Sequence, residues 1–282
     1  MTSLLITDLD NTLYDWVTFF ARSFRAMVKE LEVILGVPAE RILDEFQTTH
    51  RALGSVEQPF AVFQLPIVRE KFGSSDPAEL KACLDPALHA FNRERVQSLQ
   101  LYPGVEDALR RVVAAGVPVV AHTEASAANA FYRVARLGLA DRLQRIYVLE
   151  GPPVQHPDPV RQQKLRPPAG LVVELPVSER KPNPQLLLDI CAREGSARSE
   201  AVYIGDSLTR DVHMARLAGV TSVWARYGTQ YASAEWATVA RVTNWSDEDV
   251  KRDEALRAEA AREMPDYVAD SFADVLRVLG IQ

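Results

Sequence analysis

The chain has 282 residues, 47% of them apolar and 25% charged, a composition typical of a globular protein with one large domain or a core and a smaller companion. Its formal charge of −6 gives it no electrostatic reason to bind nucleic acid, and no run approaches the roughly 20 apolar residues of a membrane span. Acidic residues occur too early for a secretory signal. We therefore expect a cytoplasmic protein without nucleic-acid or membrane partners, whose oligomeric state the sequence leaves open.

The first predicted element is a buried strand at residues 4–7, where a short apolar run opens the chain. Residues 16–97 then show helical periodicity, interrupted by Gly and Pro. Within this block Asp76-Pro77 is a typical helix start and predicts a helix over 78–96. Because no strand pattern occurs here, the block is predicted to be all-helical.

Beyond residue 104 the sequence alternates between strand and helix patterns. The predicted strands are 117–121, 145–149, 171–175, 201–204 and 221–225. The predicted helices are 105–115, 126–137, 184–194 and 211–218. Apolar strands separated by helices indicate a parallel sheet that is covered on both faces.

The domain organisation follows from the first strand, which must join this sheet to be buried. The helical block is therefore an insertion, and we predict a discontinuous core of residues 1–14 and 101–282 with an inserted helical part of residues 15–100. Within the core, the Pro-rich stretch 151–170 is expected to be a surface loop and the charged stretch 246–263 a solvated helix.

Two carboxylates, Asp8 and Asp10, directly follow the first predicted strand. Ligands of parallel α/β sheets bind at the carboxyl ends of the strands. Two carboxylates placed two residues apart at such a point can serve one metal and one reacting centre, because one can attack phosphorus while the other moves protons. Taken alone, the pattern also fits a strand that ends in a capped turn.

Thr123 and Lys181 follow the same logic at later strands. The hydroxyl of Thr123, close to the start of a helix, suits a phosphate oxygen, although an ordinary N-cap Thr has the same appearance. Lys181 lies in a loop that Pro184 fixes at the start of a helix. A fixed ammonium group can neutralise an attacking carboxylate and a phosphate together.

A second acidic pair, Asp206 and Asp211, follows the predicted strand 201–204. Mg²⁺ takes one or two protein carboxylates and keeps waters and phosphate oxygens. Asp206 suits a direct metal ligand, and Asp211 could hold a coordinated water or Lys181. Each motif has a plain structural explanation by itself, but the order and placement of all four favour a phosphate-processing site.

Together these motifs resemble those of the haloacid dehalogenase-like (HAD) superfamily of phosphohydrolases, and the resemblance covers nearly the whole chain. It implies an α/β fold, with a Rossmann-like three-layer core around a parallel sheet and an inserted all-α cap. Caps of this kind occur in phosphoglycolate-phosphatase-like members, where they close over the substrate and exclude water.

The resemblance also assigns catalytic and metal-binding roles. It implies that Asp8 is the nucleophile, that Asp10 is the general acid/base and that Lys181 is the third catalytic residue. It places Mg²⁺ on Asp8, on the backbone carbonyl of Asp10 and on Asp206, with Asp211 as the second acid of the metal-binding motif.

The implied phosphate-binding residues are Thr123, Glu124 and Lys181. Glu124 departs from the family pattern, because many members have Asn after the second-motif Ser or Thr. An additional carboxylate close to a phosphate is unexpected, and the phosphate-binding amides could differ here.

The expected activity is that of a Mg²⁺-dependent phosphatase that hydrolyses a small phosphorylated metabolite through an aspartyl-phosphate. A dehalogenase would need neither metal nor Asp10. A phosphomutase stays possible, with Arg93 and Arg95 as candidate groups for a second phosphate, and so does a catalytically quiet binding protein. The substrate itself is not readable, although His50, Arg51 and Arg69 could face the cleft, and the residues at 14–16 lie near the start of the cap.

Overall fold

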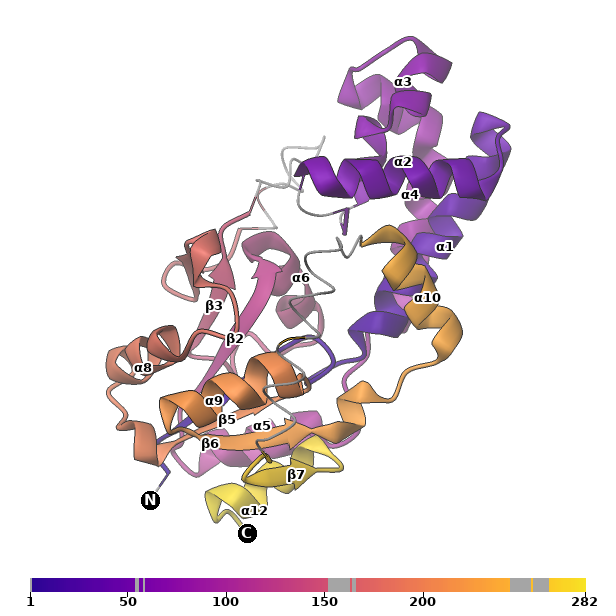
Figure 1. Ribbon diagram of the computed structural model, residues 1–282. Helices are drawn as coiled ribbons and strands as arrows, with labels where there is room; N and C mark the ends of the chain where they lie inside the picture. The colour runs from indigo at the N-terminus through magenta and orange to yellow at the C-terminus, as the bar shows by residue number, and fades with distance from the viewer. Residues whose placement is uncertain are drawn as a thin grey trace.

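The computed structural model describes residues 2–53, 56–57, 59–151, 163, 166–243, 255 and 264–282. Its centre is a seven-stranded parallel sheet with the strand order β4-β3-β2-β1-β5-β6-β7 (Figure 1). The strands are β1 (Leu4–Thr7), β2 (Val119–Ser126), β3 (Arg145–Leu149), β4 (Val172–Leu175), β5 (Ala201–Gly205), β6 (Thr221–Ala225) and β7 (Tyr267–Ala269). The first strand pairs with β2 and β5, as its burial requires.

Helices cover both faces of the sheet. They are α5 (Val105–Ala114), α6 (Ala127–Arg136), α8 (Pro184–Arg193), α9 (His213–Ala218) and α12 (Val275–Leu279). Alternate side chains of β1 show the two faces: Leu5 belongs to a buried cluster with residues of α5, α6 and α12, whereas Leu4 and Ile6 belong to a cluster with residues of α8 and α9. The predicted three-layer α/β core is confirmed.

The described part of the chain between β1 and α5 is helical, as predicted, and extends away from the sheet (Figure 1). Its elements are α1 (Trp16–Leu35), α2 (Ala39–Leu53), the 3-10 helix η1 (Pro59–Gln64), α3 (Pro66–Phe72) and α4 (Pro77–Ser98). Asp15 caps the first turn of α1, and Asp76 caps α4 with Pro77 in its first turn. The rings of Phe24 and Phe46 meet edge to face in the interior of this cap.

One helix of the core chain packs on the cap. The segment between β6 and β7 forms α10 (Ser233–Val242), which lies against α1 and α2 (Figure 1). Glu235 forms ion pairs with Arg22 and Arg25 of α1, and Arg241 with Asp44 of α2. The sequence patterns did not predict α10, because only two of its side chains, those of Val239 and Val242, are buried.

Short one-turn elements complete the described chain. They are η2 (Val177–Glu179), η3 (Arg198–Glu200), η4 (Leu208–Val212), η5 (Arg226–Thr229) and η6 (Phe272–Asp274). The helix predicted over 211–218 therefore begins earlier than expected, because the wide turn η4 leads directly into α9. No helix in the described ranges combines the length and the apolar character needed to cross a membrane.

Another predicted boundary needs correction. The strand expected over 117–121 runs from Val119 to Ser126, because Pro118 has no amide hydrogen and Val117 donates its own to Val112 at the end of α5. Thr123 therefore lies within β2 and not after it. The stretches 151–170 and 246–263, expected to be a loop and a solvated helix, fall mostly outside the described residues.

Candidate active site

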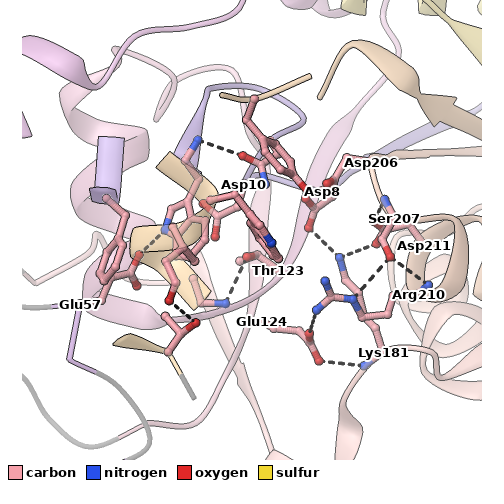
Figure 2. A pocket seen from close by; sticks show the side chains of 18 of the residues that line it. Asp8, Asp10, Glu57, Thr123, Glu124, Lys181, Asp206, Ser207, Arg210 and Asp211 are labelled. Atoms are coloured by element: carbon pink, nitrogen blue, oxygen red, sulfur yellow. Dashed lines mark hydrogen bonds and ion pairs between the residues drawn. The ribbon is translucent and has the colours of Figure 1, made fainter. Parts of the chain in front are cut away.

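Most of the candidate residues gather because β2, β1 and β5 are neighbours in the sheet, so their carboxyl ends meet at one edge, and Lys181 joins them from the loop between η2 and α8. They line a single cavity of about 370 Å³ between the sheet and the cap (Figure 2). The residues predicted from the sequence that line this cavity are Asp8, Asp10, Thr123, Glu124, Lys181, Asp206 and Asp211. The geometry thus brings together every residue that the motifs singled out.

Lys181 is buried between two carboxylates, with its side chain only 4% exposed. Its Nζ donates to Asp8 Oδ1 at 2.6 Å and to Asp211 Oδ1 at 2.8 Å (Figure 2). Burial alone would lower the pKa of Lys181, but Asp211 and Asp8 raise it well above its usual value. Lys181 is therefore a fixed positive charge in contact with the predicted nucleophile.

Asp8 lies directly beyond β1 and is also buried. The hydroxyl of Thr12 donates to Asp8 Oδ2 at 3.3 Å, so protein donors reach both carboxylate oxygens. Burial raises the pKa of Asp8 to about 7, against the opposing charge of Lys181 and with a further contribution from Asp211. The ionised form thus depends on positive charge near this carboxylate.

Three carboxylates, those of Asp8, Asp206 and Asp211, each place an oxygen within 4.8 Å of the others. The pKa of Asp206 lies well above its usual value, first because it is removed from water and then because Asp211 and Asp8 are close. A cluster of like charges that water does not solvate fits a hard divalent cation, whose ligands are carboxylate oxygens.

Asp211 is occupied within the protein. Its Oδ1 accepts from Lys181 and from the hydroxyl of Tyr203 at 3.1 Å, and its Oδ2 accepts from the amide of Ser207 at 3.0 Å. A Cβ on Gly205 would lie 2.5 Å from the Asp211 carboxyl group, so the glycine is required for this close approach. Asp211 is therefore suited to orienting Lys181, and Asp8 and Asp206 are better placed to hold a cation.

Glycine is also required in the turn after β6. A Cβ on Gly228 would overlap the backbone carbonyl of Asn11. Asn11 has a left-handed backbone with φ 58°, and its side chain accepts from the amide of Trp16 at 3.1 Å. The loop that carries Asp8 and Asp10 is thus held between η5 and the start of α1.

Thr123 and Glu124 lie at the end of β2. The Thr123 hydroxyl oxygen accepts from the amide of Ala125 at 3.2 Å. Glu124 accepts from the backbone amide of Lys181 at 3.2 Å and forms an ion pair with Arg210 at 3.1 Å. Arg210 thus neutralises the Glu124 carboxylate, which was unexpected from the family pattern. Glu124 in turn connects the loop that carries Lys181 to β2.

Asp10 belongs to a network that the motifs did not indicate. Its Oδ1 accepts from Tyr14 Oη and from Arg133 Nη1, each at 2.6 Å. Arg133 also pairs with Glu57 of the cap, whose carboxylate further accepts from Asn129 Nδ2 at 2.8 Å. Burial by itself would lower the pKa of Arg133, but Asp10 and Glu57 raise it well above the usual value.

The signal for this network was present in the sequence of α6. Arg133 is only 1% exposed and lies on the buried face of the helix with Ala130 and Val134. A buried arginine requires carboxylate partners. Which carboxylates these are could not be read from the helix, because Asp10 and Glu57 belong to distant parts of the chain.

The other basic candidates have separate positions. His50 lines the cavity, whereas Arg69 donates to the carbonyl of Phe63 at 3.2 Å and Arg95 lies over the ring of Tyr132 at 3.9 Å. Arg51, Arg69, Arg93 and Arg95 are not among the lining residues of the described cavity.

A Rossmann-like parallel sheet, a helical cap and a cavity with clustered carboxylates and a buried lysine define a capped α/β protein with an acidic site at the carboxyl edge of its sheet. The family model of haloacid dehalogenase-like hydrolases matches residues 2–219, and a second HAD-hydrolase-like model matches residues 178–275. The chain belongs to the haloacid dehalogenase-like hydrolases, and the resemblance stated from the motifs is confirmed.

Several curated proteins and solved structures are similar to this chain. A glyceraldehyde 3-phosphate phosphatase of Methanopyrus kandleri is 23% identical over 81% of this chain and 85% of its own length. A phosphoglycolate phosphatase of Salmonella paratyphi A is 30% identical over 37% of this chain and 31% of its own length. Among solved structures, a 2-haloacid dehalogenase from Pseudomonas syringae pv. Tomato has the same fold, with a TM-score of 0.56, 22% identity and 99% coverage of both chains.

Proposed function

We propose that the protein is a Mg²⁺-dependent phosphatase that hydrolyses a small phosphomonoester through an aspartyl-phosphate on Asp8. The observation that carries this proposal is the contact of 2.6 Å between Lys181 Nζ and Asp8 Oδ1 in a cavity that Asp206 and Asp10 also line. The ammonium group reduces the repulsion between an attacking carboxylate and a phosphate dianion. The phosphatase names of two relatives agree with this function.

The metal would be held by Asp8, by the backbone carbonyl of Asp10 and by Asp206. The cluster of carboxylates with raised pKa values supports this assignment. A bound Mg²⁺ supplies positive charge that stabilises the transferring phosphoryl group. Lys181 and Thr123 would bind the remaining phosphate oxygens, and Glu124 would position the loop that carries Lys181.

The chemistry takes two steps. An oxygen of Asp8 forms a bond to phosphorus while the bond to the leaving oxygen breaks, and Asp10 gives its proton to that oxygen. In the second step, water attacks phosphorus and gives a proton to Asp10, the bond from phosphorus to Asp8 breaks, and phosphate leaves. Both steps need Asp10 to be close to the leaving or attacking oxygen, and its hydrogen bonds to Tyr14 and Arg133 hold it in place.

We also propose that the cap spans residues 15–100, with core segments 1–14 and 101–282. The chain enters and leaves the cap at adjacent points, because Tyr14 forms an isolated bridge with Leu101 and the amide of Tyr102 donates to the carbonyl of Leu13 at 2.9 Å. Two crossings side by side suit a hinge about which the cap opens and closes.

The phosphatase proposal is tested by phosphate release from 4-nitrophenyl phosphate. We expect turnover with Mg²⁺ and at least a tenfold loss with excess EDTA, which added Mg²⁺ restores. Release that is unaffected by EDTA would contradict the metal role. The described cavity offers no support for the phosphomutase alternative from Arg93 or Arg95, because neither residue lines it.

Metal binding should depend on pH in a defined direction. The pKa of Asp8 is raised from 3.8 to about 7 in the folded protein, so this protein binds more protons than the unfolded chain between these values. Without metal, the Asp8 contribution to stability therefore falls as the pH rises through this window. Mg²⁺ requires the ionised carboxylate and should bind more tightly at higher pH.

We expect saturating Mg²⁺ to raise Tm at pH 8 by at least about 2 °C more than it does at pH 6. Differential scanning fluorimetry with and without Mg²⁺ measures both shifts. Asp206→Asn, which removes one proposed ligand charge, should reduce the shift at pH 8. Equal Mg²⁺ shifts at the two pH values would show that the proton on Asp8 does not compete with the metal.

A further inference from the structure

The cavity contains apolar surface as well as the acidic cluster. Trp16, Phe20 and Val56 of the cap line it, and so do Trp236 and Val239 of α10. The rings of Trp16 and Phe20 stack with centroids 5.4 Å apart. Side chains of this kind commonly form the walls of small-molecule sites and bind ligands through apolar contact.

One part of this apolar surface, the indole of Trp16, is connected to Asp10 by a series of contacts. Arg133 joins Asp10 to Glu57, and Glu57 accepts from the indole of Trp16, so these groups form a continuous series. Figure 2 shows Glu57 on the opposite side of Asp10 from Lys181. If Asp8 binds phosphorus and Asp10 protonates the leaving oxygen, the leaving group extends toward Glu57 and Trp16.

The second wall of this compartment comes from the core chain. Trp236 stacks on Tyr231 with centroids 5.2 Å apart, and both rings line the cavity. The helix that carries Trp236 is fixed on the cap by the ion pairs of Glu235 with α1. Aromatic side chains of both the cap and α10 therefore line this cavity.

The charges around the compartment oppose an anionic leaving group. Among the lining residues that the structure describes, the positively charged ones are Lys181 and Arg210, and carboxylates already neutralise both. Glu57 at the far end is already paired with Arg133 and offers no positive charge, and burial lowers the pKa of His50, which favours its neutral imidazole. A second negative charge on the substrate would thus be buried without an unpaired positive charge among the described lining residues.

We propose that the leaving group of the natural substrate is an uncharged alcohol with an aromatic or similarly bulky apolar group, which contacts Trp16 and Trp236. This inference rests on the proposed phosphatase function and adds the substrate class. It separates this protein from phosphatases of small carboxylated esters, because the apolar walls would gain nothing from such a leaving group and its carboxylate would find no unpaired positive charge among the described lining residues.

Three alkyl phosphates test the inference, because their leaving groups differ mainly in bulk and charge. We expect kcat/KM for 2-phenylethyl phosphate to exceed the values for ethyl phosphate and for phosphoglycolate by ~30-fold or more. Trp236→Ala should remove most of this preference, and Trp236→Phe should retain it. Thermal melting of each variant shows whether it is folded.

The outcomes separate the two proposals. If all three esters are hydrolysed with similar kcat/KM, or if phosphoglycolate is preferred, the enzyme is a phosphatase and the apolar leaving-group inference is wrong. If none of the esters releases phosphate with Mg²⁺, the phosphatase proposal fails and the inference fails with it. The comparison in the wild-type protein is decisive even where the Trp236→Ala protein does not fold.

Discussion

Asp8→Asn is expected to lower phosphate release by ~10⁴-fold or more, because an amide oxygen is a very poor nucleophile and no phosphoenzyme can form. The substitution should leave the fold intact. Burial raises the pKa of Asp8, so the neutral amide costs less to bury than the carboxylate it replaces. Lys181 keeps its second partner, Asp211, at 2.8 Å.

Mass spectrometry after rapid acid quench measures the phosphoenzyme directly. Wild-type protein should gain one phosphoryl group on the peptide that contains Asp8, and the variant should gain none. Asp189→Asn is the matched control, because Asp189 is an exposed carboxylate on α8 that bonds to Gln185. If the Asp8→Asn variant hydrolysed the substrate at the wild-type rate, nucleophilic attack by Asp8, the central step of the proposed mechanism, would be wrong.

Arg133→Lys is expected to reduce kcat/KM in a way that depends on the leaving group. Lysine retains the charge, but it lacks the planar fork with which Arg133 reaches Asp10 and Glu57 together. If Arg133 positions Asp10 as the general acid, the loss should be about 10²-fold for 2-phenylethyl phosphate. It should stay below about tenfold for 4-nitrophenyl phosphate, whose leaving group needs little protonation.

The dependence on leaving group distinguishes a positioning role from a purely structural one. A variant that is merely less stable would lose activity toward both substrates equally. Tyr14→Phe removes only the hydroxyl that donates to Asp10. It should also reduce kcat/KM more for 2-phenylethyl phosphate than for 4-nitrophenyl phosphate, but by smaller factors. Arg136→Lys, an exposed change on the same helix, should change neither value. Equal losses for both esters would refute a positioning role for Arg133.

Much of the core could be predicted because its signals are local. The strands at 4–7, 145–149 and 221–225 are apolar runs between polar or Gly-containing turns, and the structure places β1, β3 and β6 at these positions. The predicted helix starts at Asp76-Pro77 and at Pro184 depend on capping groups within a few residues. Such features need no knowledge of the rest of the chain.

Elements with weak local patterns were missed. α10 buries two side chains, and β7 has three residues, of which one is buried. Their positions depend on contacts with α1, α2 and β6, which are made by residues far away in the sequence. Periodicity shows that a face is apolar, but it cannot show that a neighbouring surface exists to cover a helix that buries only two side chains.

The sequence by itself determined the class of the fold and the residues of the first, third and fourth motifs, because each motif follows a strand whose apolar pattern is local. Only the tertiary structure decided how these residues are connected. Arg133 lies 123 residues from Asp10 and 76 from Glu57, and their charges stabilise one another only because the fold brings them into contact in a buried place. The same holds for α10. The part of the cavity that α1 and α10 line exists only once these two distant segments have packed against each other.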